Sequence, residues 1–180
     1  ANSHNYSGHL KAKPLYTVEE AKKCFNLFST HDYREWVILN NDFKFQLLNA
    51  GHILGSALVE IKALDKTLVF SGDIGRKDPM LMYPPQKVDH ADYIILESTY
   101  GDRTHHTENV KSALKDIIND TYNRGGILMI PTFAVERAQE LIYLIYQLKE
   151  SGELPNIPVY LDSPMGVKST MVFDRYPQIQ

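Results

Sequence analysis

Short runs of alternating apolar and polar residues dominate the first hundred residues of the chain. Residues 35–52 and 56–73 each contain two such runs around a turn, the first near Asn40 and the second at Asp65 and Lys66. Residues 92–101, "DYIILESTYG", form a further apolar run that is short enough for a buried strand. Because a period of two is typical of strands, this region predicts a sheet arranged as meanders.

One helix is expected before these strands, in "PLYTVEEAKKCFNLFS". Thr17 and Glu20 have the spacing of a capping box, and Cys24, Phe25 and Phe28 then recur at helical spacing. The pattern predicts an amphipathic helix, with Cys24 as a small core residue.

After Gly101 the pattern changes to helices that alternate with strands. A helix that starts near Thr107 and stops at Gly125 precedes the strand "ILMIP", and a second helix in "AVERAQELIYLIYQLKESG" precedes the strand "IPVYLD". Such alternation predicts a parallel α/β sheet with crossover connections. We therefore expect two domains, residues 1–101 and residues 102–180.

The composition is that of a globular protein. Hydrophobic residues make up 43% of the chain, and 19 basic against 22 acidic residues give a net charge of -3, so any surface for nucleic acid must be local. A single cysteine excludes an internal disulfide framework and is typical of a reducing compartment. Since no apolar stretch approaches the roughly 20 residues of a membrane span, we expect a soluble, cytoplasmic protein with no membrane partner.

Three apolar runs lead directly into a polar residue beside glycine or small residues: His52 in "NAGHILGS", Asp73 in "FSGDIG" and Glu97 in "ILESTYG". Catalytic groups often follow rigid strands, because the sheet fixes the side chain while glycine leaves room for a ligand. Imidazole and carboxylate groups are zinc ligands, and one aspartate can bridge two ions. A carboxylate at the end of a buried strand, as expected for Asp73, also requires a cation or a shifted pKa.

Each of these residues also has an interpretation without chemistry. His52 is compatible with a hydrogen-bonded loop histidine. Asp73 can accept hydrogen bonds from the next two backbone amides in an Asx turn. Glu97 can pair with Arg103 or Arg137. The local sequence does not separate these alternatives.

Five strings in fixed order, "AGHILGSA", "SGDIGR", "ESTYGDR", "PTFAVERAQE" and "YLDSPMG", resemble the metallo-β-lactamase-fold RNA nucleases of the β-CASP group. This group includes bacterial and archaeal ribonucleases and the cleavage and polyadenylation endonuclease. The resemblance runs from about Tyr16 to Gln180. It implies part of a metallo-β-lactamase αββα sandwich, followed by the first half of a β-CASP α/β domain, the RNA specificity domain.

The resemblance also implies a role for each candidate residue. His52 matches a histidine that ligates one zinc ion, and Asp73 matches the carboxylate that bridges both zinc ions. Glu97 matches an acidic residue that orients a catalytic histidine. The implied activity of the full-length protein is zinc-dependent hydrolysis of RNA phosphodiester bonds. Endonuclease or exonuclease action and a preference for RNA over DNA are left open.

The sequence also departs from the family pattern. The main metal-binding string of the family, His-x-His-x-Asp-His, has no match, because "HNYSGH" with His4 and His9 lacks the Asp-His pair. The family's later histidines have no match either. We therefore expect an internal excerpt of a longer protein that is inactive alone and binds little or no zinc. Self-association into homo-oligomers is expected, either by pairing of exposed sheet edges or by packing of an uncovered apolar sheet face.

Weaker candidates for RNA contacts are Arg103, Arg137 and Lys168. Arg103 lies in a polar loop and Arg137 begins a helix, and both arginines and helix starts favour phosphate. Surface charge is the alternative for all three. Tyr143 and Tyr146 are expected to pack in a core rather than to stack on bases.

Two other functions are compatible with parts of the pattern. The first is a small-molecule hydrolase of the same metal fold, such as a thioesterase, which the α/β region in the second half disfavours. The second is a noncatalytic RNA-binding or scaffold homologue, which the joint presence of His52, Asp73 and Glu97 disfavours.

Overall fold

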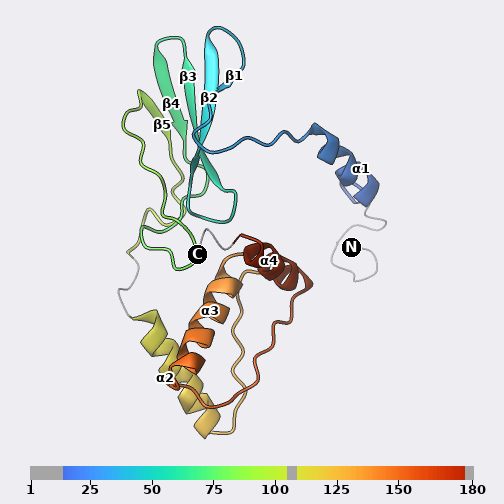
Figure 1. The fold of residues 1–180 in the computed structure, drawn as a ribbon, viewed down its shortest axis with the longest axis vertical. Coiled ribbons are helices and arrows are strands. Elements are labelled where there is room, and N and C mark those ends of the chain that lie inside the picture. Colours follow the sequence, from blue (N-terminus) through green and yellow to red (C-terminus); the bar gives the residue numbers. More distant parts are fainter. Residues whose placement is uncertain (1–13, 105–108, 177–180) are drawn as a thin grey trace. The chain divides into compact units, whose positions relative to one another are not determined.

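The computed structural model describes residues 14–104 and 109–176 (Figure 1). The chain divides into two compact units, residues 1–32 and residues 33–180. Helices and strands are both present, so the mixed α/β class expected from the sequence is confirmed. The expected division into domains near Gly101 stays a prediction.

The first unit contains the short helix α1 (Val18–Lys23), followed by a 3₁₀ turn (Cys24–Leu27). The predicted capping box is confirmed: the Glu20 amide donates to Thr17 Oγ1 at 3.2 Å, and the Thr17 amide donates to Glu20 Oε2 at 2.7 Å. The prediction that Cys24 is a core residue is wrong, because Cys24 is exposed. The chain tightens into the 3₁₀ turn at this residue, so the expected apolar stripe is broken and no residue of α1 is buried.

The second unit begins with a sheet of five strands: β1 (Val37–Ile38), β2 (Phe43–Asn49), β3 (Ala57–Ala63), β4 (Lys66–Phe70) and β5 (Tyr93–Ile95). The strands are ordered β1-β2-β3-β4-β5, and the first four pair antiparallel, as the meander pattern predicts. β5 pairs parallel to β4, so the expectation of meanders throughout is wrong for this strand. Residues 71–92 connect β4 to β5. They return the chain to the end of the sheet at which β4 begins, so that β5 can run parallel to β4.

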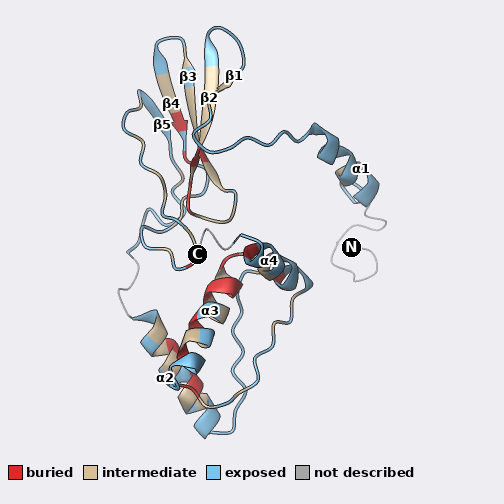
Figure 2. Ribbon diagram, in the orientation of Figure 1, coloured by how far each residue is buried: buried red, intermediate tan, exposed pale blue. Residues whose placement is uncertain are grey.

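The two faces of the sheet differ in burial, because successive side chains point to opposite faces (Figure 2). One face carries a small core of Leu48, Ala50 and Leu58, against which Ile74 and Val88 pack. The opposite face is apolar but incompletely covered. Its members include the exposed residues Phe43, Phe70, Tyr93 and Ile95.

The run that ends in Asp73 and the run of β5 were both expected to be buried strands. In β4 only Val69 is buried, and β5 contains no buried residue. Ile94, in the last strand of the sheet order, is 62% exposed. The expectation of buried strands is therefore wrong for β5 and holds only in part for β4.

Three helices form in the second half of the chain: α2 (Val110–Asn123), α3 (Arg137–Glu150) and α4 (Pro164–Asp174). The predicted helices correspond to α2 and α3, and glycines at φ +66° and +71°, Gly125 and Gly152, follow them as expected. The predicted start at Thr107 lies outside the described residues. Helix α4 was missed, although Ser163 caps it and Pro164 is its first residue, a known start signal.

Helices α2 and α3 pack through a core of Leu114, Ile118, Leu144, Leu148 and Leu154. The expectation that Tyr143 and Tyr146 pack in a core is wrong. Both side chains are exposed, Tyr143 by 37% and Tyr146 by 57%. The helical repeat points Leu144 and Leu148 inward and leaves both tyrosines toward solvent.

The predicted strands "ILMIP" and "IPVYLD" are not strands in the structure: among the described residues, no strand follows Ile95. Both segments are without regular structure, and Ile127 and Tyr160 are 90% and 85% exposed. A parallel strand requires hydrogen-bonded neighbours on the same sheet, and these segments have none in the described part of the chain. None of the helices in that part is long and apolar enough to cross a membrane.

Candidate active site

The ends of three strands meet at one edge of the sheet. β2 and β4 are both antiparallel to β3, and β5 is parallel to β4, so β2, β4 and β5 run in the same direction. His52 follows β2, Asp73 follows β4 and Glu97 follows β5. The sheet therefore brings together three residues that are far apart in the sequence. We call His52, Asp73 and Glu97 the strand-end cluster.

Backbone contact between two glycine loops holds His52 close to Asp73. The Gly75 amide donates to the Ala50 carbonyl at 2.8 Å, and a Cβ on Gly75 would collide with the backbone of Gly51. Gly51 itself has φ +64°, a conformation that favours glycine. Here glycine permits a close approach of backbone rather than leaving room for a ligand, which corrects the sequence-based interpretation.

Glu97 is held by hydrogen bonds at three points. The Ile74 amide donates to Glu97 Oε1 at 2.6 Å, and the Thr99 hydroxyl donates to Oε2 at 2.8 Å. The Glu97 amide donates to Ser71 Oγ at 2.9 Å. The bond from Ile74, followed by the bond from Thr99, lowers the pKa of the Glu97 carboxyl, and the nearby His52 contributes in the same direction. Glu97 is therefore a fixed carboxylate at neutral pH.

The alternative ion pairs of Glu97 do not form. Arg103 bonds to Asp102, with its Nε 2.9 Å from Oδ1. Arg137 bonds to Glu136 and Glu140, at 3.2 Å and 2.6 Å. The structure thus supports a role for Glu97 within the strand-end cluster.

His52 and Asp73 face each other, with Nε2 of the histidine 3.9 Å from Oδ2 of the aspartate. The Asp73 side chain is 74% exposed, so the expectation of a buried carboxylate that requires a cation for stability is wrong. The Asx-turn alternative is also wrong, because the Ile74 amide donates to Glu97 and the Gly75 amide donates to Ala50. The Asp73 carboxylate is open toward solvent and toward His52.

His52 and Asp73 have the nitrogen and oxygen ligands that a zinc ion takes, but their nearest ligand atoms are 3.9 Å apart. Around a tetrahedral zinc ion, neighbouring nitrogen and oxygen ligands lie about 3.3 Å apart, so a small side-chain rotation brings these two atoms into range. Within residues 14–104 and 109–176, no group of three or more histidine, cysteine, aspartate or glutamate side chains is arranged to hold a metal ion. His4 and His9 lie outside the described residues. The pair is thus part of a site that needs further ligands.

The three basic residues predicted to contact RNA, Arg103, Arg137 and Lys168, have surroundings that differ from one another. Arg103 is exposed, and its guanidinium lies 6.0 Å from the Tyr100 ring centroid. Arg137 is half-buried and committed to two carboxylates. Lys168 is exposed on α4. The structure does not bring these three basic residues into the strand-end cluster.

Sequence reasoning missed the residues that position Glu97, namely Ser71 and Thr99. Both lie next to the motifs, in "FSGD" and "ESTYG", and a hydroxyl within two residues of a strand-end carboxylate was the available signal. It also missed Glu136, a buried carboxyl at φ +67°. Burial, together with the charge of Glu140, raises the pKa of Glu136 to about 7.

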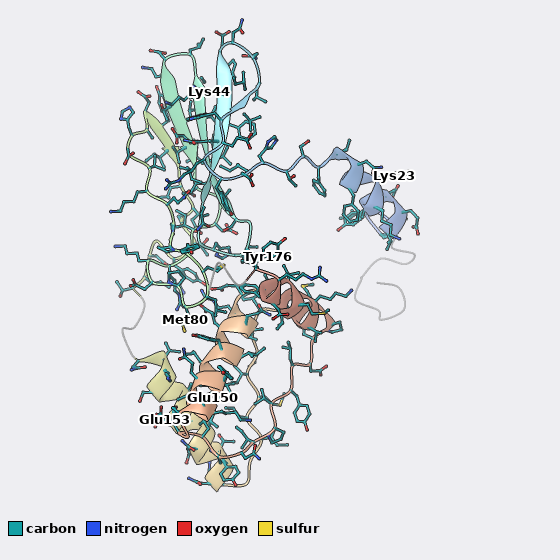
Figure 3. All side chains as sticks on the ribbon, viewed as in Figure 1. Lys23, Lys44, Met80, Glu150, Glu153 and Tyr176 are labelled. Carbon is teal, nitrogen blue, oxygen red and sulfur yellow. The ribbon has the colours of Figure 1, made fainter. Side chains whose placement is uncertain are left out.

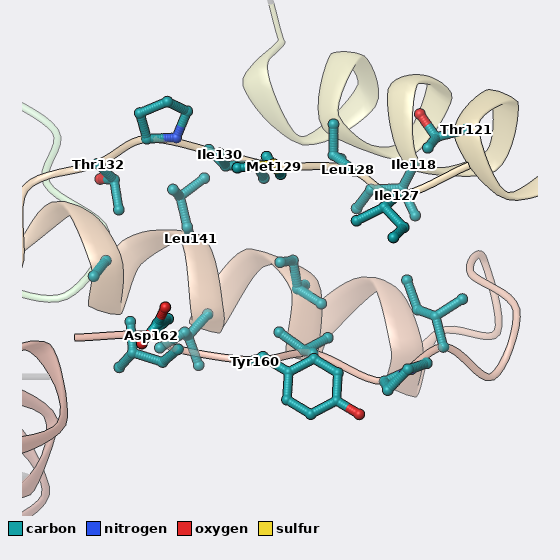
Figure 4. A pocket seen from close by; sticks show the side chains of 18 of the residues that line it. Ile118, Thr121, Ile127, Leu128, Met129, Ile130, Thr132, Leu141, Tyr160 and Asp162 are labelled. Atoms are coloured by element: carbon teal, nitrogen blue, oxygen red, sulfur yellow. The ribbon is translucent and has the colours of Figure 1, made fainter. Parts of the chain in front are cut away.

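A large cavity of about 1120 Å³ lies elsewhere, beside α2 and α3 (Figure 4). Its lining is mainly apolar and includes residues 126–132 and 156–163. Asp162 is its only carboxylate, so the cavity lacks the grouped polar side chains of the strand-end cluster. The cluster of His52, Asp73 and Glu97, rather than this cavity, is therefore the candidate for catalytic chemistry.

Comparisons with known proteins identify relatives. Residues 138–180 match the family model of the Beta-Casp domain. Over 169 residues the chain is 37% identical to Ribonuclease TTHA0252 of Thermus thermophilus, which covers 93% of this chain and 38% of that protein. An RNase J-like protein of Methanocaldococcus jannaschii is 32% identical over 171 residues, with 93% and 40% covered. Endoribonuclease YSH1 of Eremothecium gossypii is 31% identical over 176 residues, with 94% and 23% covered.

The chain spans about two fifths or less of the length of these relatives. The resemblance that the sequence motifs indicated is confirmed by these matches.

Proposed function

We propose, from the membership of this chain in the β-CASP family of RNA nucleases, that it forms part of a zinc-dependent ribonuclease. In this proposal the residues up to about Gly101 supply metal ligands at the sheet edge, and the later residues supply one wall of the RNA cleft. The observation that carries the proposal is the convergence of His52, Asp73 and Glu97 at one edge of the sheet.

His52 and Asp73 would hold the zinc. Among the described contacts, Asp73 accepts no hydrogen bond that competes with a metal, and its side chain is 74% exposed. When bound, zinc supplies Lewis-acid stabilisation of the charge that develops on a phosphodiester during hydrolysis. An aspartate with two available oxygens is also suited to bridge two ions.

Glu97 would act as a positioning residue. Its two oxygens each accept one hydrogen bond and keep a second lone pair, so the carboxylate can orient a neighbouring histidine that donates a proton to the leaving oxygen. The lowered pKa of Glu97 keeps this group ionised across the neutral range. A carboxylate fixed in this way holds its partner in one orientation.

The 180-residue chain alone would be inactive, because a zinc site needs more than two protein ligands. It would also self-associate through the partly uncovered apolar face of the sheet, which includes Phe43, Phe70 and Ile95. We place the protein in the cytoplasm, with RNA as its substrate, on the basis of its composition and of relatives that are named ribonucleases.

Metal removal tests this proposal in a full-length protein that contains the segment. Chelation should abolish hydrolysis of a labelled single-stranded RNA, and added zinc should restore it, whereas added magnesium should not. Full activity in the chelated protein would contradict zinc dependence. Zinc analysis of the 180-residue chain after dialysis should give far less than one ion per chain.

A further inference from the structure

A polar groove lies on one face of the sheet. This face is opposite the incompletely covered apolar face that includes Phe43, Phe70, Tyr93 and Ile95. The groove has a volume of about 490 Å³, which is within the range of ligand sites. Its floor consists of side chains from β2, β3 and β4, including Gln46, Glu60 and Thr67. Arg34, Trp36 and residues 87–90 also line the groove.

Two lysines lie over the single tryptophan of the chain: Trp36 and Lys62 line the groove, and Lys44 lies beside it. Lys44 Nζ lies 4.8 Å and Lys62 Nζ 5.0 Å from the Trp36 ring. Lys44 and Lys62 are directly opposite each other in the β2–β3 register (Lys44 is labelled in Figure 3). Like charges at such a pair of positions destabilise a sheet, and neither lysine forms an ion pair in the described part of the chain.

The indole attracts both ammonium groups but does not neutralise them. The cation–π contacts therefore offset only part of the repulsion between the two ammonium groups. An anion bound between the two lysines would remove the repulsion. This arrangement points to a ligand with a phosphate group.

Other basic residues extend the site. Arg34 and Lys87 both line the groove, and neither forms an ion pair within residues 14–104 and 109–176. Arg34 has φ +66°, and its amide is fixed by a hydrogen bond of 2.8 Å to the Leu47 carbonyl. Of the carboxylates in the groove, Glu60 already accepts a hydrogen bond from Gln46 at 2.7 Å. With Lys44 beside it, the groove has four basic residues against two carboxylates, Glu60 and Asp89, so it is locally basic on a chain of net charge -3.

A basic groove beside an aromatic ring is the combination that binds single-stranded nucleic acid, because cations track the backbone and the ring accepts a stacked base. We propose that this groove anchors single-stranded RNA, with a phosphate between Lys44 and Lys62 and a base against Trp36. The proposal rests on the RNA substrate proposed above. It places an RNA contact roughly 17 Å along β2 from the edge where His52 lies, at about 3.4 Å per residue.

The single tryptophan makes the groove directly observable. In a titration of the 180-residue chain with a short uridine oligoribonucleotide, Trp36 emission should change with saturation. The double variant Lys44→Ala/Lys62→Ala should bind at least about tenfold more weakly, measured with a labelled oligonucleotide. Its plot of log affinity against log salt should be shallower by about 0.7, because the contact to one phosphate of a single strand is lost.

The matched control is Lys22→Ala/Lys23→Ala on α1, which removes the same charge outside the groove and should bind as the parent chain does. Equal weakening by both double variants would overturn the proposal, as would equally strong competition by inorganic phosphate or by poly-glutamate. Lys44→Gln/Lys62→Gln replaces the alanine variant if circular dichroism shows that the latter is unfolded. Addition of a chelator should leave this binding unchanged, so a failure of the proposed zinc site is distinguished from a failure of the groove.

Discussion

The sheet region up to Gly101 and the helical region from Val110 onward differ in how many of their predicted helices and strands form in the structure. In the sheet region every predicted strand pairs with at least one other strand. In the helical region the predicted helices α2 and α3 form, but neither predicted strand does. The difference follows from where the hydrogen-bond partners lie. A helix satisfies its backbone within one segment, whereas a strand depends on segments elsewhere in the chain.

The helical region nevertheless has a core of its own, and Leu148 tests how strongly that core holds α2 and α3 together. Leu148 has 0% exposure. Leu148→Ala should lower the free energy of unfolding by about 4 kcal/mol, because it removes buried methyl groups and leaves a cavity. Hydrogen exchange should show the loss of protection in α2 and α3. Tyr146→Ala, on the exposed face, is the control and should change stability by less than about 0.5 kcal/mol.

Gly75 tests the sheet region at its most constrained backbone contact. Gly75→Ala should destabilise the protein by about 3 kcal/mol and disturb the contact between His52 and Asp73, because a Cβ collides with the Gly51 backbone. Gly55→Ala is the control: it has open space around it but φ +82°, so it should cost only about 1 kcal/mol. Equal effects in denaturant melts would contradict the close approach of the two loops.

Two carboxyls, one in each region, have pKa shifts of opposite sign. The raised pKa of Glu136 means that the folded state keeps a proton that the unfolded state releases, so this group lowers stability as pH rises from about 4.5 to about 7. Glu136→Gln should therefore gain about 2 kcal/mol at pH 8 and little at pH 4. Exposed Glu150→Gln should show no such dependence. A gain that is equal at both pH values would contradict the assignment.

The pKa of Glu97 is lowered, so its contribution has the reverse sign. It stabilises the sheet region above the ordinary glutamate pKa and is lost as pH falls through the lower folded value. Thermal melts of Glu97→Gln and the parent chain should differ most near neutral pH and converge in acid.

The smallest effect is expected at the start of α4, which sequence reasoning missed. The Gly166 amide donates to Ser163 Oγ at 3.0 Å. Ser163→Ala should cost about 1 kcal/mol through loss of this cap. Ser169→Ala, within the same helix, should be neutral or slightly stabilising, because alanine is the better helix former. Equal costs would show that the cap does not stabilise α4.

The sequence allowed the local features of both regions to be predicted. The capping box of Thr17 and Glu20, the β2–β3 and β3–β4 pairs, and the glycines that follow α2 and α3 depend on neighbouring residues. The parallel pairing of β5 and the lack of regular structure in "ILMIP" depend on distant segments. Neither was predicted correctly.

At the candidate site, the sequence indicated His52, Asp73 and Glu97 but not the contacts between them. The hydrogen bond from the Ile74 amide to Glu97 joins two loops 23 residues apart, which no local pattern reveals. The exposure of Asp73 was also hidden, because an apolar run gives no information on how its end is covered.

Asp73 provides the most direct test of the proposed catalytic edge. In a full-length protein that contains this segment, Asp73→Ala should reduce the turnover of single-stranded RNA by at least about 100-fold with an unchanged melting temperature, because a metal ligand is lost. Asp78→Ala, an exposed aspartate five residues further on, should retain parental turnover. Turnover of the Asp73 variant within about tenfold of the parent, or roughly 1.4 kcal/mol of barrier, would contradict the assignment of Asp73 as a metal ligand.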